Sequence, residues 1–182
     1  HEVAERYLQQ ALGLHREFGE TTVTGMTPTL LGRLAYERGD LETAKEVLEA
    51  SLVQSPDSFN PIGIAWSLTA LARIRQQRGE YALAAQACLQ SLELRREYGD
   101  RAGCISCMRR LADVANATDA NDVAAQLLAA VEALGESLGL SLSGERRERY
   151  LQAIDLAQAS LAPDTFSTIW QAGRQMTISD AL

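Results

Sequence analysis

Apolar residues recur at spacings of three and four through the middle of the chain, which is the pattern of helices with one buried face. Ile64, Leu68, Leu71, Ala72 and Ile74 fall on one side of a helix that Asn60-Pro61 would begin and Gly79 would end. A second helix follows at once, and its apolar positions are Tyr81, Ala84, Ala85, Cys88, Leu89 and Leu92. Because the turn between them is so short, the two helices must lie antiparallel.

The same pattern returns after 40 residues. It places Leu31, Gly32, Gly39, Asp40, Leu41, Ala44, Leu48 and Leu52 on Leu71, Ala72, Gly79, Glu80, Tyr81, Ala84, Cys88 and Leu92. A shift of 80 residues aligns 4–20 with 84–100, and a weaker third copy carries Leu111, Ala124 and Leu128. Self-similarity at a fixed period of this length indicates a stack of helix pairs that share a continuous core.

These positions resemble the tetratricopeptide (TPR-like) repeat over residues 1–138. Two features depart from its usual form. The period is 40 rather than 34, which implies longer helices or loops, and Ala35 or Arg75 replaces the usual tyrosine before the turn. The resemblance implies an all-α fold, an α-α superhelix built as a TPR-like solenoid of antiparallel helix pairs.

The remaining residues, 139–182, are predicted to form C-terminal capping helices on the last repeat, within a single continuous domain. Ser143 is expected to cap a helix running to about Leu161, and Pro163 to begin another helix. That next helix would present Phe166, Ile169 and Trp170, and 177–182 looks like the opening of one more. The mixed charges at 145–149 indicate a solvated helix face rather than a binding patch.

The order of residues from Ala124 onward also resembles the C-terminal region of bacterial LuxR-type and AfsR-like multidomain regulators. In those proteins the repeats follow a P-loop signalling ATPase. The first residue here is His1 rather than Met, so we expect a fragment of a larger parent protein.

Charge and hydropathy narrow the possible partners. The chain has 17 Lys and Arg against 24 Asp and Glu, a net charge of −7, which disfavours direct binding to nucleic acid. It has neither a run of 18 apolar residues nor a basic leader with a short apolar stretch, so we expect no membrane span, no secretion signal and a cytoplasmic location.

Few residues suggest catalysis. Cys104 and Cys107 form a C-x-x-C, but a second ligand pair for zinc is missing and the expected context is helical, so we interpret both thiols as packed side chains. The two histidines, His1 and His15, give little material for a nucleophile-activating triad, and no nucleotide-binding loop occurs. We therefore expect a protein that is not an enzyme, with no cofactor and no metal.

The resemblance instead assigns a concave surface to the first helix of each pair, at five positions per repeat. These positions are Met26, Thr29, Arg33, Tyr36 and Glu37; Trp66, Thr69, Arg73, Gln76 and Gln77; and Ser106, Arg109, Asp113, Asn116 and Ala117. The nine that we select as the partner-binding groove are Arg33, Tyr36, Trp66, Thr69, Arg73, Gln77, Arg109, Asp113 and Asn116.

Arg33, Arg73 and Arg109 could form a basic ladder that grips carboxylates by paired hydrogen bonds, with Trp66 and Tyr36 as anchors. The arginines could equally serve solubility or pair with Glu37 and Asp113, and Trp66 could belong to the core. The preferred function is an interaction or sensor domain of a bacterial transcriptional regulator, which binds a protein segment or its own ATPase module. Two alternatives stay open: small-molecule sensing, which some activators with a similar superhelix perform, and a scaffold that forms a homodimer.

Overall fold

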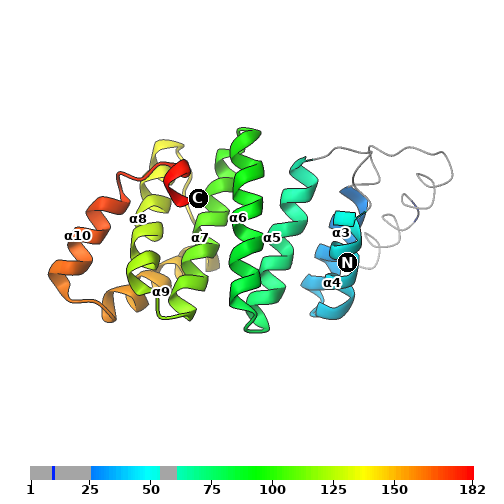
Figure 1. The fold of residues 1–182 in the computed structure, drawn as a ribbon, viewed down its shortest axis with the longest axis horizontal. Helices are drawn as coiled ribbons and strands as arrows, with labels where there is room; N and C mark the ends of the chain where they lie inside the picture. The colour runs from blue at the N-terminus through cyan, green and yellow to red at the C-terminus, as the bar shows by residue number, and fades with distance from the viewer. Residues whose placement is uncertain (1–9, 11–25, 54–60) are drawn as a thin grey trace. The chain divides into compact units, whose positions relative to one another are not determined.

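The structure, a computed structural model, describes residue 10, residues 26–53 and residues 61–182 of the chain (Figure 1). Two compact units are distinguished, residues 1–94 and residues 95–182, and each is considered by itself. Every regular element in the described residues is a helix.

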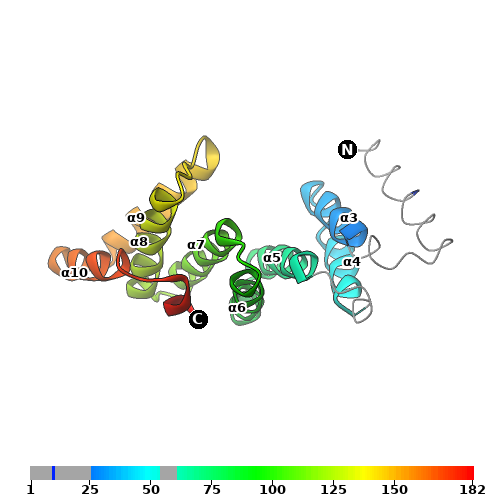
Figure 2. The ribbon, with the colours of Figure 1, turned by 90° about the horizontal axis from the view of Figure 1, so that it is seen from above.

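The first unit contains α3 (Met26–Glu37), α4 (Leu41–Val53), α5 (Pro61–Gln77) and all but the last turn of α6 (Tyr81–Glu97). Helices α3 and α4 lie side by side and antiparallel, as Figures 1 and 2 both show. Their common core with α5 is built from Ala44, Leu48, Leu71 and Ile74, all fully buried. Partly buried side chains of α3, among them Tyr36, pack against this cluster.

The second unit begins with the last turn of α6. It continues with α7 (Arg101–Ala117), α8 (Asn121–Ser137), α9 (Glu145–Ala159), α10 (Pro163–Gly173) and a short 3-10 helix, η1 (Ile178–Ala181). Helix α8 contacts α7, α9 and α10. Alanines let these helices approach closely, since the core cluster consists of Ala115, Ala124, Ala125 and Ala157.

The turns recur with the 40-residue period. Gly39, Gly79 and Asp119 each follow the first helix of a pair and have φ of 81°, 75° and 59°, in the left-handed region. In each turn the next amide reaches five residues back, as in Asp40 N–H to the Ala35 carbonyl at 3.0 Å. This hydrogen bond satisfies a carbonyl that the end of the helix would otherwise leave without a partner. Aspartate tolerates this conformation better than most side chains, and it replaces the glycine in the weak third copy.

Helix length explains the long period. Helices α5, α6, α7 and α8 each have 17 residues, and α5 and α7 begin at Pro61 and Arg101. The expected start at Pro61 is therefore confirmed, while Asn60 lies outside the described residues. Asp40 caps α4: its carboxylate accepts a hydrogen bond from the Thr43 backbone N–H at 3.1 Å.

Three details of the C-terminal segment differ from the sequence predictions. Gly144, not Ser143, precedes α9, and its φ of 54° suits a glycine rather than a capping side chain. Helix α9 ends at Ala159, two residues before the expected end at about Leu161. After α10 the chain forms only the single turn of η1, closed by reciprocal hydrogen bonds between Thr177 and Asp180.

The predicted apolar face of α10 is confirmed. Phe166 and Ile169 pack against the alanine cluster, and the Phe166 and Trp170 rings stack with centroids 5.3 Å apart. The charged residues 145–149 are exposed, as expected. Within the described residues, no helix combines the length and apolar character needed to cross a membrane.

Candidate functional site

The most distinctive surface contact of the first unit joins α3 to α5. The Arg73 guanidinium lies over the Tyr36 ring, 4.4 Å from its centroid. Tyr36 is held in place because its ring also packs against the core cluster. This is a cation–π contact, and it fixes a long side chain that would otherwise sample many rotamers. Two of the nine predicted site residues are therefore brought together.

Other arginines of this unit bind carboxylates. Arg78 pairs with Glu42, Arg75 lies 3.5 Å from Glu49, and Arg33 lies 3.6 Å from Glu37. The contact that the structure gives Arg73, in contrast, is the tyrosine ring, so no carboxylate of the described residues neutralises it. Its N–H donors are not used in an ion pair with the described part of the chain.

Trp66 lies on the same helix as Arg73 and is 46% exposed, which places it on the surface rather than in the core. Arg73 is the seventh residue after Trp66. On an α-helix this spacing gives nearly the same direction, about 20° apart, and a separation of about 10.5 Å along the axis. The two residues therefore share one face of α5, and we refer to Tyr36, Trp66 and Arg73 as the α3–α5 face.

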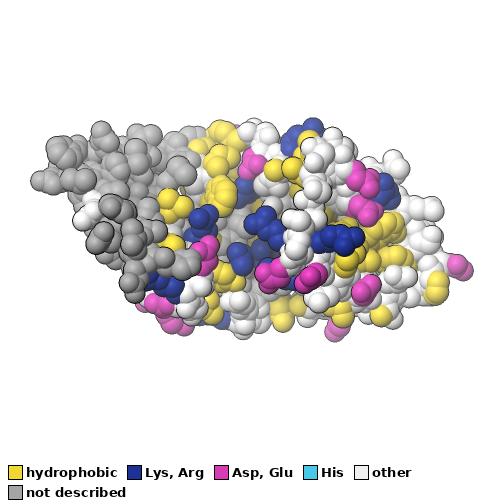
Figure 3. Space-filling model, turned by 180° about the vertical axis from the view of Figure 1, so that it is seen from behind, with side chains coloured by type: hydrophobic (Ala, Val, Ile, Leu, Met, Phe, Trp, Pro, Cys, Tyr) yellow, Lys and Arg dark blue, Asp and Glu magenta, His cyan; other side chains and the backbone are white. Residues whose placement is uncertain are grey.

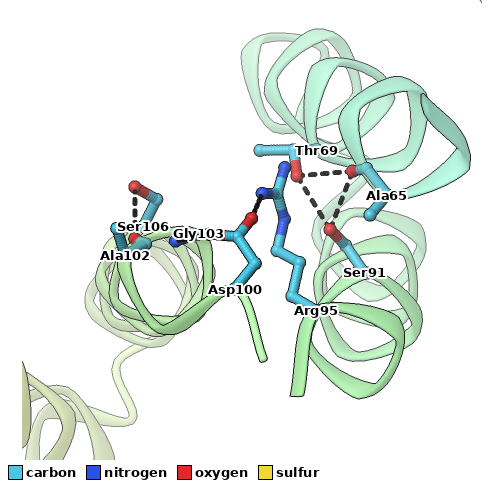
Figure 4. Close-up of polar contacts among 8 residues, drawn as sticks. All are labelled: Ala65, Thr69, Ser91, Arg95, Asp100, Ala102, Gly103 and Ser106. Carbon is cyan, nitrogen blue, oxygen red and sulfur yellow. Dashed lines mark hydrogen bonds and ion pairs between the residues drawn. The ribbon is translucent and has the colours of Figure 1, made fainter. Parts of the chain in front are cut away.

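The predicted groove threonines have hydroxyls that bond to neighbouring helices. Thr29 is buried, and its hydroxyl lies 2.7 Å from that of Ser67. The Thr69 hydroxyl lies 2.9 Å from that of Ser91 on α6 and 2.8 Å from the Ala65 carbonyl oxygen (Figure 4). Thr29 and Thr69 are 40 residues apart and therefore occupy equivalent positions of the repeat. At both positions the hydroxyl bonds to a serine of another helix, so the repeat conserves a contact between helices.

The remaining predicted residues of the first unit, Arg33 and Gln77, are exposed. The pair of Arg33 with Glu37 is nearly half exposed on both sides, 46% and 42%, so it contributes little to stability.

The predicted residues of the second unit lie on α7 and bind within that unit. Arg109 lies 3.6 Å from Asp113, and the Asn116 side-chain amide donates a hydrogen bond to the Ala153 carbonyl on α9 at 2.9 Å. Burial raises the pKa of Asp113, against the lowering effect of the nearby arginines Arg109, Arg110 and Arg149. The ladder of Arg33, Arg73 and Arg109 draws on both units and stays a prediction.

One polar cluster of the second unit was not predicted from the sequence. Arg95 is only 4% exposed and forms an ion pair with Asp100, whose carboxylate also accepts the Gly103 backbone N–H at 2.8 Å (Figure 4). A Cβ on Gly103 would collide with both side chains, so the glycine makes room for the pair. The signal was the sequence Arg95…Asp100-x-x-Gly103, in which a capping aspartate follows an arginine by five residues.

The cysteines are packed side chains. Cys88, Cys104 and Cys107 are fully buried and are not in disulfides. Burial, followed by the charge of Cys107, raises the pKa of Cys104 to about 11. In the described part of the chain, no group of three or more His, Cys, Asp or Glu side chains is placed to hold a metal ion.

Charges of opposite sign lie close together on the face drawn in Figure 3, with apolar side chains between them. This agrees with the number of arginines that bind carboxylates in the two units, such as Arg78 with Glu42 and Arg174 with Glu132 and Glu136. On the α3–α5 face, Arg73 stacks on an aromatic ring instead.

Comparisons with known proteins show the fold. No family model matches the chain, and no curated protein does. Among solved structures, the chain is similar to the nearly identical TPR-like repeats of a putative kinesin light chain from Podosopora anserina, with a TM-score of 0.65. The match covers 95% of this chain and 85% of that one, at 17% sequence identity. The chain is therefore an all-α protein of TPR-like helix pairs, as the repeat predicted.

Proposed function

We propose that this chain is a non-catalytic interaction module of a larger regulatory protein, and that it binds a protein segment, including one supplied by the same parent chain. The α3–α5 face is the observation that carries the proposal. It presents a half-exposed tryptophan and an arginine fixed on a tyrosine ring, from two adjacent first helices. Tryptophan, tyrosine and arginine are the residues that most often dominate binding energy at protein interfaces.

The parent that we propose is a bacterial multidomain transcriptional regulator with a P-loop signalling ATPase. The resemblance of residues 124–182 to the C-terminal region of such proteins supports it. In that setting the module would bind the ATPase or an incoming protein segment and thereby control activation. The similar structure from P. anserina supports the repeat architecture; it belongs to a putative kinesin light chain, not to a regulator.

The test uses intrinsic fluorescence. The chain has two tryptophans, so Trp170→Phe leaves Trp66 as its single reporter. We expect titration with segments of the parent protein, each expressed separately, to change the Trp66 emission with a saturable curve. Titration calorimetry is the second readout. If every parent segment leaves the Trp66 emission unchanged and gives no heat of binding, intramolecular binding is wrong.

A second measurement tests the arginines. Arg73→Ala combined with Arg109→Ala should weaken binding of the captured segment while far-ultraviolet circular dichroism retains the helix signal. Unchanged affinity in the double variant would rule out the basic ladder. The two single variants are measured as well. If Arg73→Ala weakens binding and Arg109→Ala does not, the site is restricted to the α3–α5 face.

A further inference from the structure

The α3–α5 face has a geometry that specifies its ligand more closely than "a protein segment". We infer that it reads two side chains of that segment at once, an acidic group on Arg73 and an apolar group on Trp66, about 10 Å apart. The inference rests on the proposed function and names the partner chemistry of the same site.

The acidic half follows from the state of Arg73. Its guanidinium is stacked on the Tyr36 ring at 4.4 Å and is not paired with a carboxylate of the described residues. Stacking leaves the N–H donors at the edge of the guanidinium plane available, and these match the two oxygens of a carboxylate. Because the ring already restricts the side chain, less conformational entropy is lost when a ligand binds.

The apolar group of the ligand is inferred from Trp66 and from the small residues that lie between Trp66 and Arg73. Thr69 and Ala70 occupy the intervening turn of α5, and both are small. The Thr69 hydroxyl bonds to Ala65 and Ser91, while Ala70 packs against the core cluster. A ligand that contacts Trp66 and Arg73 therefore meets no large side chain of this turn.

An extended ligand matches this spacing. A polyproline II segment has three residues per turn and rises about 3.1 Å per residue, so side chains at i and i+3 point the same way about 9 Å apart. Side chains at i and i+2 point in different directions. The face therefore fits a short extended segment with an apolar and an acidic residue three positions apart.

The experiment uses capped proline-rich peptides as probes. One carries leucine and glutamate three residues apart, the second replaces the glutamate with glutamine, and the third places leucine and glutamate two residues apart. Binding is followed by ¹⁵N chemical-shift changes at the Trp66 indole. We expect the second and third peptides to bind about tenfold more weakly than the first, as expected for a lost charge-assisted hydrogen bond.

Protein variants assign the effect to residues. Arg73→Gln should abolish the preference for glutamate over glutamine. Tyr36 is a positioning residue, so Tyr36→Leu, which keeps an apolar side chain in the core, should reduce the preference, and Tyr36→Phe should retain it. Arg78→Gln removes an equal charge from the same region, where Arg78 pairs with Glu42, and should leave the preference unchanged.

Two outcomes would overturn the inference: equal binding of the glutamate and glutamine peptides, or a preference that survives Arg73→Gln. Its failure is separable from that of the proposed function. The double variant Trp66→Ala, Arg73→Gln separates the two. If a parent segment binds it with undiminished affinity, the chain is still an interaction module, but the two-residue recognition by Trp66 and Arg73 is wrong. Absence of binding by every parent segment would instead remove the intramolecular form of the proposed function, whatever the peptides do.

Discussion

The hydroxyl of Ser67 on α5 lies between the hydroxyls of Thr29 on α3 and Ser51 on α4, at 2.7 and 3.0 Å. Ser51 donates to the Leu48 carbonyl at 2.6 Å, so it can only accept from Ser67. Ser67 then accepts from Thr29, and the chain of donors runs Thr29, Ser67, Ser51, Leu48. All three hydroxyls belong to buried residues, so solvent contributes little to their hydrogen bonding.

Ser67→Ala tests this chain. Removing the middle hydroxyl takes one buried hydrogen bond from Thr29 and one from Ser51. We expect a loss of about 2 kcal/mol in the free energy of unfolding, measured by urea denaturation. Ser106→Ala is the control because the Ser106 hydroxyl is exposed and bonds only to the Ala102 carbonyl of its own helix. An equal effect of the two substitutions would contradict the donor chain.

Gly173→Ala tests the contact of α10 with α8. A Cβ on Gly173 would collide with the Gln126 carbonyl oxygen and come within 2.8 Å of the Ala129 Cβ. Because a backbone oxygen cannot rotate away, we expect a loss of about 2 kcal/mol from overpacking. Gly135→Ala in α8 is the matched control: its nearest atom would be the Leu140 carbonyl oxygen at 3.6 Å, an ordinary contact. That variant should be neutral or more stable by up to about 1 kcal/mol in thermal melts.

Asp100 is expected to be the most sensitive acidic residue of the second unit. Asp100→Ala removes the ion-pair partner of the buried Arg95 and the N-cap of α7 together, so a loss of about 3 kcal/mol is expected. Asp100→Asn keeps a capping oxygen and should cost less. Glu37→Gln, which breaks the exposed pair with Arg33, should change stability by less than about 0.5 kcal/mol. Similar losses for Asp100→Ala and Glu37→Gln in chemical denaturation would refute the buried pair.

The thiol of Cys104 should be unreactive in the folded protein. Burial raises its pKa from the ordinary 9.0 to about 11, so the thiolate is scarce at pH 8. Iodoacetamide should label Cys104 only after denaturation, which peptide mass spectrometry would detect. The raised pKa also means that the unfolded chain releases this proton first. The contribution of Cys104 to stability is therefore complete below pH 9 and falls as the pH rises from about 9 towards 11. Rapid labelling of native protein would show that Cys104 is accessible.

The match between sequence and structure is closest in the turns. The glycines at 39 and 79 and the helix starts at Leu41, Pro61 and Tyr81 follow from local rules, because a left-handed residue and an N-terminal proline act within one helical turn. Gly144 shows the limit: Ser143 satisfies the same local rule for a cap, but the chain enters α9 through the glycine.

The candidate site was predictable only in part. The repeat placed Tyr36 and Arg73 on first helices, but their stacking depends on how α3 packs beside α5, which no spacing along the chain encodes. Thr69 illustrates the opposite outcome. It occupies the same predicted surface, yet its hydroxyl bonds to the Ala65 carbonyl and to Ser91 on α6.

The sequence by itself therefore determined the helices, their turns and the 40-residue repeat, because these depend on hydrophobic periodicity and on the backbone preferences of single residues. Only the tertiary structure decided the partners of the polar side chains. Packing buries Arg95 against Asp100, although its side chain is charged. Arg73 has the same chemistry, and packing placed it on an aromatic ring instead. The difference arises because a side chain's partner is set by the helix that packs beside it, not by its own helix.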